Sequence, residues 1–212
     1  PLIRRSQAIT LFQEISESFS TVRSVCITMR GCSYQGSLYS RLTDAMDVLE
    51  QLCGQVELLD AAMSTPHGMS TEAPDSLRAM HGHLTINTRF AENCCGCVQV
   101  SDVGSTWSRG ITILGDGGCA RLTDKAFEWW DQSGKLVDSA RLDDSYESSM
   151  VTTIDQLPAR LLAEQINRVL DPHKPRLEQR NVSRVVAVCE AIRLSLVTGA
   201  SETPRKLLEL IK

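Results

Sequence analysis

Arg41-Leu-Thr-Asp44-Ala-Met-Asp47-Val-Leu-Glu-Gln-Leu-Cys-Gly54, followed at once by the apolar run 56–63, is the stretch that decides the fold. Its apolar residues recur at helical spacing and would form one buried helix face: Leu42, Ala45, Met46, Leu49, Leu52 and Cys53. Gly54 is a typical residue at which a helix ends. The stretch therefore predicts an amphipathic helix followed directly by a strand.

Two acidic residues of this helix, Asp44 and Asp47, are three positions apart, so their side chains should be neighbours on the side opposite the apolar face. Two nearby carboxylates can raise the pKa of one of them, which suits acid/base chemistry. The same spacing is also that of an ordinary solvated helix face. The spacing alone leaves both interpretations open.

Length and composition bound the class of protein. The 212 residues suit one large domain or two small ones, and a hydrophobic fraction of 42% is enough for a real core. The net charge is −4 and the 22 Lys and Arg are scattered, which favours neither nucleic acid nor a membrane surface as a partner. We find no apolar stretch near the ~20 residues that span a bilayer and no secretory signal, so we expect a cytoplasmic protein. Pro1 in place of Met suggests a fragment or a processed product.

The eight cysteines indicate reduced thiols rather than a disulfide framework. Cys26, Cys53 and Cys189 fall in apolar patterns and are predicted core residues. The cluster 94–97 is the one place to consider a metal. Zinc usually takes four ligands as two separated pairs, and neither a second cysteine pair nor ligand-spaced histidines accompany this cluster, so we expect no metal.

Alternating strands and helical stripes occupy different parts of the chain. A helix over 6–19 and a strand over 22–29 precede the opening stretch. Short strands separated by turn signals predict antiparallel hairpins in the middle of the chain: 84–90, 97–103, 109–114, 119–122, 126–130 and 135–137. Helical stripes return at 154–170 and 182–196, and Thr203-Pro204 begins a short last helix. The class is therefore α+β, a large, mostly antiparallel open sheet with helices on one face.

The chain lacks the motifs of a complete nucleotide site. Gly115-Asp-Gly-Gly118 is its only glycine-rich turn, and it links two predicted strands instead of opening a helix towards a phosphate. GxGxxG and Walker sequences are absent. We therefore assign no cofactor-binding residue within the chain.

Together, these elements and their junctions resemble the C-terminal domain of the Gfo/Idh/MocA oxidoreductases, the group of glucose–fructose oxidoreductase and inositol dehydrogenase. Residues 44–54 match, without a gap, the family helix pattern His-x-x-Asp-x-x-x-x-Leu-x-Gly. The strand 84–90 with its turn at Glu92-Asn93 is similar to a family strand ending in Phe-x-Asn/Asp-Gly, and 111–118 resembles a strand leading into a Gly-Thr-x-Gly turn. The helical segments 155–170 and 178–197 fit the family's closing pair, so the resemblance covers nearly the whole chain.

The resemblance implies a two-domain enzyme in which residues 1–212 are the single C-terminal substrate and oligomerisation domain. NAD or NADP would be bound by a Rossmann domain upstream of Pro1, and the substrate would be a sugar, a polyol or a related hydroxyl compound. The family Asp falls on Asp47, whereas the family His, a frequent proton acceptor, falls on Asp44. An Asp with an ordinary pKa of about 4 is a weak base, so Asp44 could serve only if Asp47 and a dry pocket raised its pKa. Tyr39 and Arg41 lie nearby as expected substrate-binding residues.

This departure keeps other functions open. The protein could be a non-catalytic binding or scaffolding relative that kept the fold and lost the His. A third possibility is an independent interaction domain unrelated to the dehydrogenases. His67, His81 or His83 could replace the missing His. The open sheet face, with its expected mixture of Ile, Val, Cys and polar side chains, predicts a homodimer or homotetramer.

Overall fold

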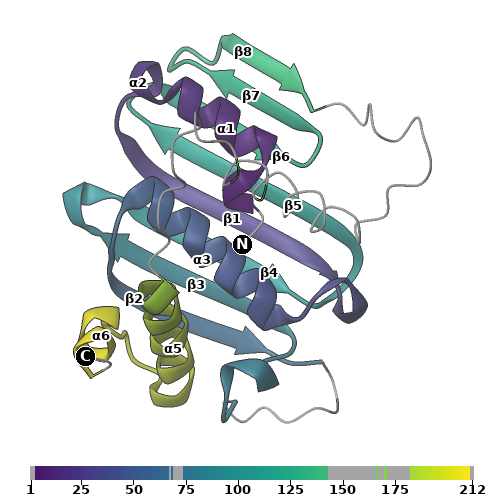
Figure 1. The fold of residues 1–212 in the computed structure, drawn as a ribbon, viewed down its shortest axis with the longest axis vertical. Coiled ribbons are helices and arrows are strands. Elements are labelled where there is room, and N and C mark those ends of the chain that lie inside the picture. The colour runs from purple at the N-terminus through teal and green to yellow at the C-terminus, as the bar shows by residue number, and fades with distance from the viewer. Residues whose placement is uncertain are drawn as a thin grey trace.

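The computed structural model describes residues 3–66, 68, 74–142, 166, 170 and 182–210 (Figure 1). An eight-stranded sheet forms its main layer, in the order β2-β3-β4-β1-β5-β6-β7-β8. The strands are β1 Val22–Cys32, β2 Val56–Ser64, β3 His83–Phe90, β4 Cys95–Ser101, β5 Val103–Gly115, β6 Gly118–Thr123, β7 Ala126–Trp130 and β8 Leu136–Arg141. The predicted helix at 154–170 lies outside the described residues, apart from two helical positions within it.

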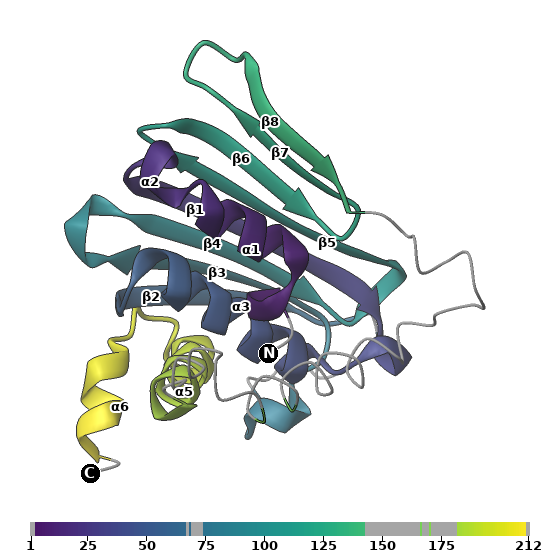
Figure 2. The same ribbon diagram turned by 45° about the horizontal axis from the view of Figure 1, so that its top comes forward.

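Helices cover one face of this sheet, as Figures 1 and 2 show. The α-helices are α1 Gln7–Glu14, α2 Ser16–Phe19, α3 Leu38–Cys53, α5 Val182–Thr198 and α6 Pro204–Leu210. Four single turns of 3-10 helix accompany them: η1 Ile3–Arg5, η2 Ser33–Gln35, η3 Leu77–Ala79 and η4 Ala91–Asn93. Helix α3 packs on β1 and β4, α5 on β2, and α1 on β6 and β7. The predicted α+β class is confirmed.

Local signals set the ends of α3. The side chain of Ser37 accepts a hydrogen bond from the backbone N–H of Ser40 at the first turn, and Gly54 follows the last residue with a φ of 85°, which favours glycine. Most of the predicted apolar face is buried against the sheet, and only two residues separate the end of the helix from the strand β2. The opening stretch therefore forms the predicted helix–strand unit.

Strand pairing differs from a simple meander at the centre of the sheet. β1 pairs with β4 in parallel and with β5 in antiparallel, so β4 and β5 are neighbours in sequence but not in the sheet. β5 begins at Val103 rather than at the predicted residue 109, because its first residues continue the pairing with β1 as far as Cys32. Glycines allow this close approach, since a Cβ added to Gly104 would lie 3.0 Å from the backbone nitrogen of Gly31.

The two faces of the sheet differ in polarity. Ile27, Ile86 and Val98 are buried beneath the helices, and the residues that alternate with them are mostly polar. The expected Ile and Val side chains on the open face are therefore wrong for these strands, since the pleat turns them towards the core. Cys189 is buried as predicted, whereas Cys26 lies on the open face and is only partly buried.

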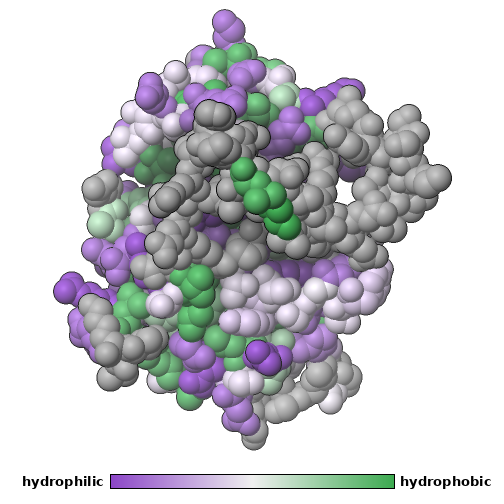
Figure 3. Space-filling view, in the orientation of Figure 1, coloured by the Kyte–Doolittle hydropathy of each residue, from purple (hydrophilic) through white to green (hydrophobic). Residues whose placement is uncertain are grey.

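The helix-bearing side of the described surface mixes hydrophilic and hydrophobic residues (Figure 3). Within the described part of the chain, we find no helix with the length and apolar character needed to cross a membrane. All eight cysteines are free thiols.

Candidate functional site

The two predicted acidic residues of α3 do lie on one side of the helix, and both contact the chain start. Asp44 Oδ1 accepts a hydrogen bond from the backbone N–H of Ile3 at 3.2 Å. Asp47 Oδ1 lies 3.5 Å from the guanidinium of Arg4. Asp47 is only 2% exposed, so the interpretation as an ordinary solvated face does not hold for it. The first turn, η1, is thus fastened to α3 through both carboxylates.

A third acid, Glu50, continues this row one turn further along α3. Its carboxylate lies 3.3 Å from the guanidinium of Arg184 on α5. Burial raises the pKa of Glu50, and the positive charge of Arg184 opposes that rise. Asp44, Asp47 and Glu50 therefore form an acidic row along α3 with arginines from two other elements beside it.

Arg41, expected to bind substrate, turns instead towards the ends of β1 and β4. Its guanidinium donates hydrogen bonds to the carbonyl oxygens of Gly31 (3.1 Å), Cys32 (2.7 Å) and Ser101. The side chain is 2% exposed and lies over the ring of Trp107, 5.5 Å from its centroid. Burial lowers the pKa of Arg41, and the nearby charge of Asp102 partly opposes this. The contacts support a role in fastening strand ends, and substrate binding by Arg41 stays a prediction.

A buried acid, Asp102, lies beside Arg41 and pairs with the partly exposed His81. The imidazole Nδ1 of His81 is 2.9 Å from Asp102 Oδ2, and the backbone N–H of Gly82 donates to Asp102 Oδ1 at 2.8 Å. The sequence singled out His81 as a possible substitute for the missing His but missed Asp102. The available signal was the alternation of the predicted strand, which places position 102 on the same face as the buried Val98 and Val100. The contact of Asp102 with Nδ1 favours the tautomer that carries its proton there.

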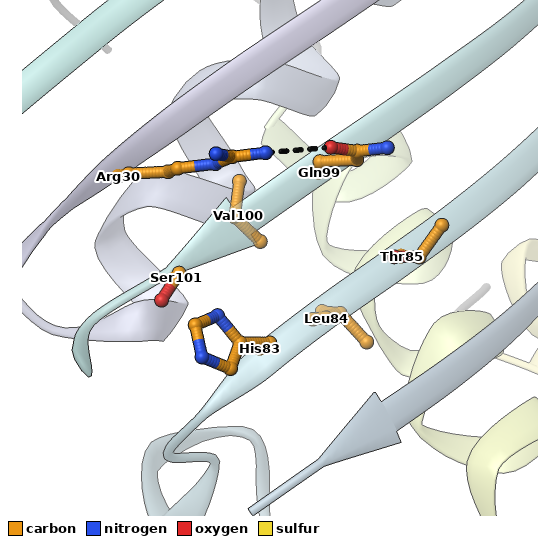
Figure 4. A pocket seen from close by; sticks show the side chains of 7 residues that line it. All are labelled: Arg30, His83, Leu84, Thr85, Gln99, Val100 and Ser101. Atoms are coloured by element: carbon orange, nitrogen blue, oxygen red, sulfur yellow. Dashed lines mark hydrogen bonds between the residues drawn. The ribbon is translucent and has the colours of Figure 1, made fainter. Parts of the chain in front are cut away.

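The four predicted site residues do not converge on one cavity. Tyr39 packs partly buried against the core, and Asp44 and Asp47 face η1, away from the strand ends that Arg41 reaches. Two of the surface hollows among the described residues have other linings, and neither is lined by any of these four. One, of about 330 Å³, lies on the open sheet face around Arg30 and His83 (Figure 4). The other, of about 490 Å³, lies between the end of α3 and the start of β1.

The glycine-rich turn 115–118 is not placed to hold the phosphates of a dinucleotide. The glycine turn 115–118 joins β5 to β6, and a Cβ added to Gly117 would strike the backbone of Phe19. Gly115 and Gly117 are thus explained by packing against Phe19 and Thr21, and Gly118 by its φ of 112° and the nearby backbone of Trp130, rather than by a phosphate. Among the residues that the structure describes, we find no group of three or more His, Cys, Asp or Glu placed to hold a metal ion.

Comparison with known proteins identifies the fold. No family model and no curated protein matches the sequence. Levoglucosan dehydrogenase in complex with NADH and levoglucosan superposes with a TM-score of 0.71 at 13% identity, over 95% of this chain and 64% of its own length. An oxidoreductase from Agrobacterium radiobacter in complex with NAD+, L-tartaric acid and magnesium gives 0.69 at 15%, over 97% and 64%. The WlbA dehydrogenase from Bordetella pertussis, in complex with NADH and UDP-GlcNAcA, gives 0.68 at 18%, over 95% and 62%.

These structures are NAD-binding oxidoreductases of the Gfo/Idh/MocA type, and the part that this chain matches is their C-terminal domain. The fold predicted from the resemblance is thereby confirmed. At this level of identity the likeness concerns the fold alone. The chain spans about 64% of the length of the solved structures that it matches.

Proposed function

We propose that this chain, with the fold of the C-terminal domain of Gfo/Idh/MocA oxidoreductases, is the substrate-binding and oligomerisation domain of an NAD(P)-dependent oxidoreductase. Its substrate would be a sugar, a polyol or a related hydroxyl compound. The observation that carries the proposal is the likeness over 95% of the chain to a levoglucosan dehydrogenase that binds NADH and levoglucosan. The likeness to WlbA, solved with a nucleotide sugar acid, supports the same substrate class.

In this proposal, the nicotinamide cofactor belongs to a domain outside residues 1–212 and supplies the hydride chemistry there. The chain would supply one wall of the substrate site through the row of Asp44 and Asp47. Asp47 would orient the substrate and Asp44 would take the position of the family's proton acceptor. Both roles require substrate to reach carboxylates that now contact Ile3 and Arg4.

The test uses the full-length protein with NAD+ and NADP+ and a panel of sugars and polyols, following reduced nicotinamide by absorbance. We expect turnover in wild type and a loss of about 100-fold or more in kcat/KM for Asp47→Asn, the size expected when a positioned acid/base or orienting group is removed. Asp60→Asn is the matched control, since Asp60 is an exposed acid of β2 that contacts only Asn87 among the hydrogen bonds described. Wild-type turnover in a folded Asp47→Asn protein would remove Asp47 from the mechanism.

One observation favours a second candidate, a non-catalytic binding or scaffolding protein. The two carboxylates at the expected catalytic positions are already engaged by the first turn of the chain. If so, the full-length protein would turn over neither nicotinamide with any member of the panel, while a panel compound would still raise its melting temperature. Turnover at any rate that depends on Asp47 excludes this candidate.

We also propose that the protein is a homodimer or a homotetramer through the open sheet face. Leu114 and Trp130 are apolar side chains on that face, and Leu114 is 47% exposed. Sedimentation velocity of the full-length protein tests this directly. Leu114→Arg should shift the distribution towards the monomer, because a charge would be placed in the contact.

A further inference from the structure

The hollow on the open sheet face is built from two rows of paired residues. In the first row Arg30 on β1 is paired with Ser101 on β4, which is paired with His83 on β3. In the second, Gln99 on β4 stands between Thr28 on β1 and Thr85 on β3. Paired residues in a sheet project on the same face, so these six side chains form a grid. All of them except Thr28 line the hollow.

The grid places the guanidinium of Arg30 and the imidazole of His83 on two sides of the hollow, with room between them for a small ligand. Neighbouring strands lie about 4.8 Å apart, so Arg30 and His83 stand about 10 Å apart at the backbone, with the small Ser101 between them. Figure 4 shows the Arg30 and Gln99 side chains along one border of the hollow and the His83 ring on the other, beside Ser101. Leu84 and Val100 also line the hollow, but they are buried residues and contribute little polarity. The space is wide enough for a group of the size of a phosphate.

The donors of the hollow are arranged for an anion. Arg30 Nη2 donates to Gln99 Oε1 at 3.1 Å, which holds the guanidinium in place and turns the amide group of Gln99 into a donor for a ligand. No acidic residue is among those that line this hollow in the described part of the chain. The nearest acid in sequence, Asp102, is buried and bonded to His81 and Gly82. A neutral sugar would gain little from a guanidinium, whereas a phosphate or carboxylate forms charge-assisted hydrogen bonds with it.

We propose that this hollow binds a small anion, through a phosphate or carboxylate group placed between Arg30 and His83. The site is separate from the acidic row of α3, because it lies on the opposite face of the sheet. It goes beyond the proposed oxidoreductase function and does not depend on it. An acidic side chain of a second copy could fill the hollow in place of a free anion, and that occupant would exclude the proposed site.

The test titrates inorganic phosphate into the full-length protein at low ionic strength and follows the heat of binding. We expect saturable binding with a Kd of about 1 mM, which a few charge-assisted hydrogen bonds can support. Arg30→Gln should weaken binding about tenfold or more and His83→Gln several-fold. Arg89→Gln is the matched control. Arg89 lies on the same face of β3 as His83 but at the other end of the strand, where it is paired with Cys95, so the substitution should change Kd less than twofold.

Two outcomes overturn the proposal. Equal phosphate affinity in wild type and in both Arg30→Gln and His83→Gln would place any bound anion elsewhere. No phosphate binding, together with a dimer in sedimentation velocity that dissociates in Arg30→Gln, would assign the hollow to a carboxylate of a second copy. Because neither readout uses nicotinamide, failure of the anion site and failure of the oxidoreductase proposal are distinguishable.

Discussion

Replacing Arg41 by Met should destabilise the protein by about 3–5 kcal/mol, because a buried cation holds the ends of two strands. Three carbonyl oxygens, of Gly31, Cys32 and Ser101, accept from its guanidinium. Each hydrogen bond to a charged group contributes about 1.5–3 kcal/mol, and a buried acceptor left without a donor costs about 1–3 kcal/mol. Met fills a similar volume and removes the cost of burying the charge, which offsets part of the loss.

Two measurements follow this prediction in the full-length protein. Urea unfolding monitored by circular dichroism gives the change in free energy, and hydrogen exchange with mass spectrometry reports where it occurs. Protection should fall at residues 30–32 and 101–103 before it falls in α5, since those strand ends lose their donor. Arg89→Gln, an exposed substitution on β3, should change stability by less than about 0.5 kcal/mol.

The proposed structural role of Arg41 can be refuted by the stability of the Arg41→Met variant. A folded Arg41→Met protein within 1 kcal/mol of wild type, with unchanged exchange at the strand ends, would show that these contacts contribute little. If the same variant lost substrate affinity, the substrate-binding role predicted from the sequence would be the correct one. The experiment therefore decides between the two roles of this residue.

Two further variants test the packing and the acidic row. Glu50→Gln should flatten the dependence of stability on pH. Burial raises the pKa of Glu50 in the folded protein, so the folded wild type binds more protons than the unfolded chain. The wild type therefore loses stability as the pH rises through that raised pKa, and the variant should not. Urea midpoints at acid and neutral pH measure the slope, and an unchanged slope in the variant would contradict this cause. Gly82→Ala should cost more than about 2 kcal/mol, because φ is 130° and its Cβ would strike the carbonyl oxygen of Ser64. Gly134→Ala is the control, since Gly134 also has a positive φ but nothing within 4 Å; equal melting temperatures for the two variants would mean that the clash is relieved.

Periodicity predicted the elements that depend on local pattern. The apolar positions of α3 and the residue that ends it are encoded within one stretch, and the structure confirms both. The strand β7, Ala126–Trp130, has the predicted bounds, and its two tryptophans face opposite sides: Trp129 contacts Phe19 and Trp130 lies over Arg121. Short hairpins place such strands next to each other, so local signals suffice there.

Long-range pairing could not be predicted in the same way. β1 and β4 pair in parallel across about 70 residues of chain, and no local feature of either strand specifies that partner. The early start of β5 depends on the approach of Gly104 to Gly31, which becomes visible only when the two strands are placed together. The predicted strand 97–103 consequently ended too late, and the strand 109–114 began too late.

Candidate site residues are harder still, since their chemistry is set by partners far away in sequence. Arg41 was expected to meet substrate because it lies one turn before Asp44, but its donors reach a carbonyl 60 residues away. Asp102 looked like part of a strand until the fold brought His81 to it. The sequence gives each residue's chemical type, whereas the fold decides whether that chemistry is used for a ligand or for the protein itself.

The contacts of η1 bear on the proposed function in two opposing ways. The bonds of Ile3 and Arg4 engage both Asp44 and Asp47, and Asp47 is also buried, which counts against their direct use on a substrate. In the proposed two-domain enzyme, however, the cofactor domain would join the chain ahead of η1, so the same contacts would set the acidic row of α3 at the junction of the domains. A substrate held there would lie between the nicotinamide and Asp47, and Arg4 would be the cation in contact with Asp47 beside it. Catalysis therefore requires that the substrate be accommodated beside the pair of Arg4 and Asp47, whereas a scaffolding role requires only that the pair persist.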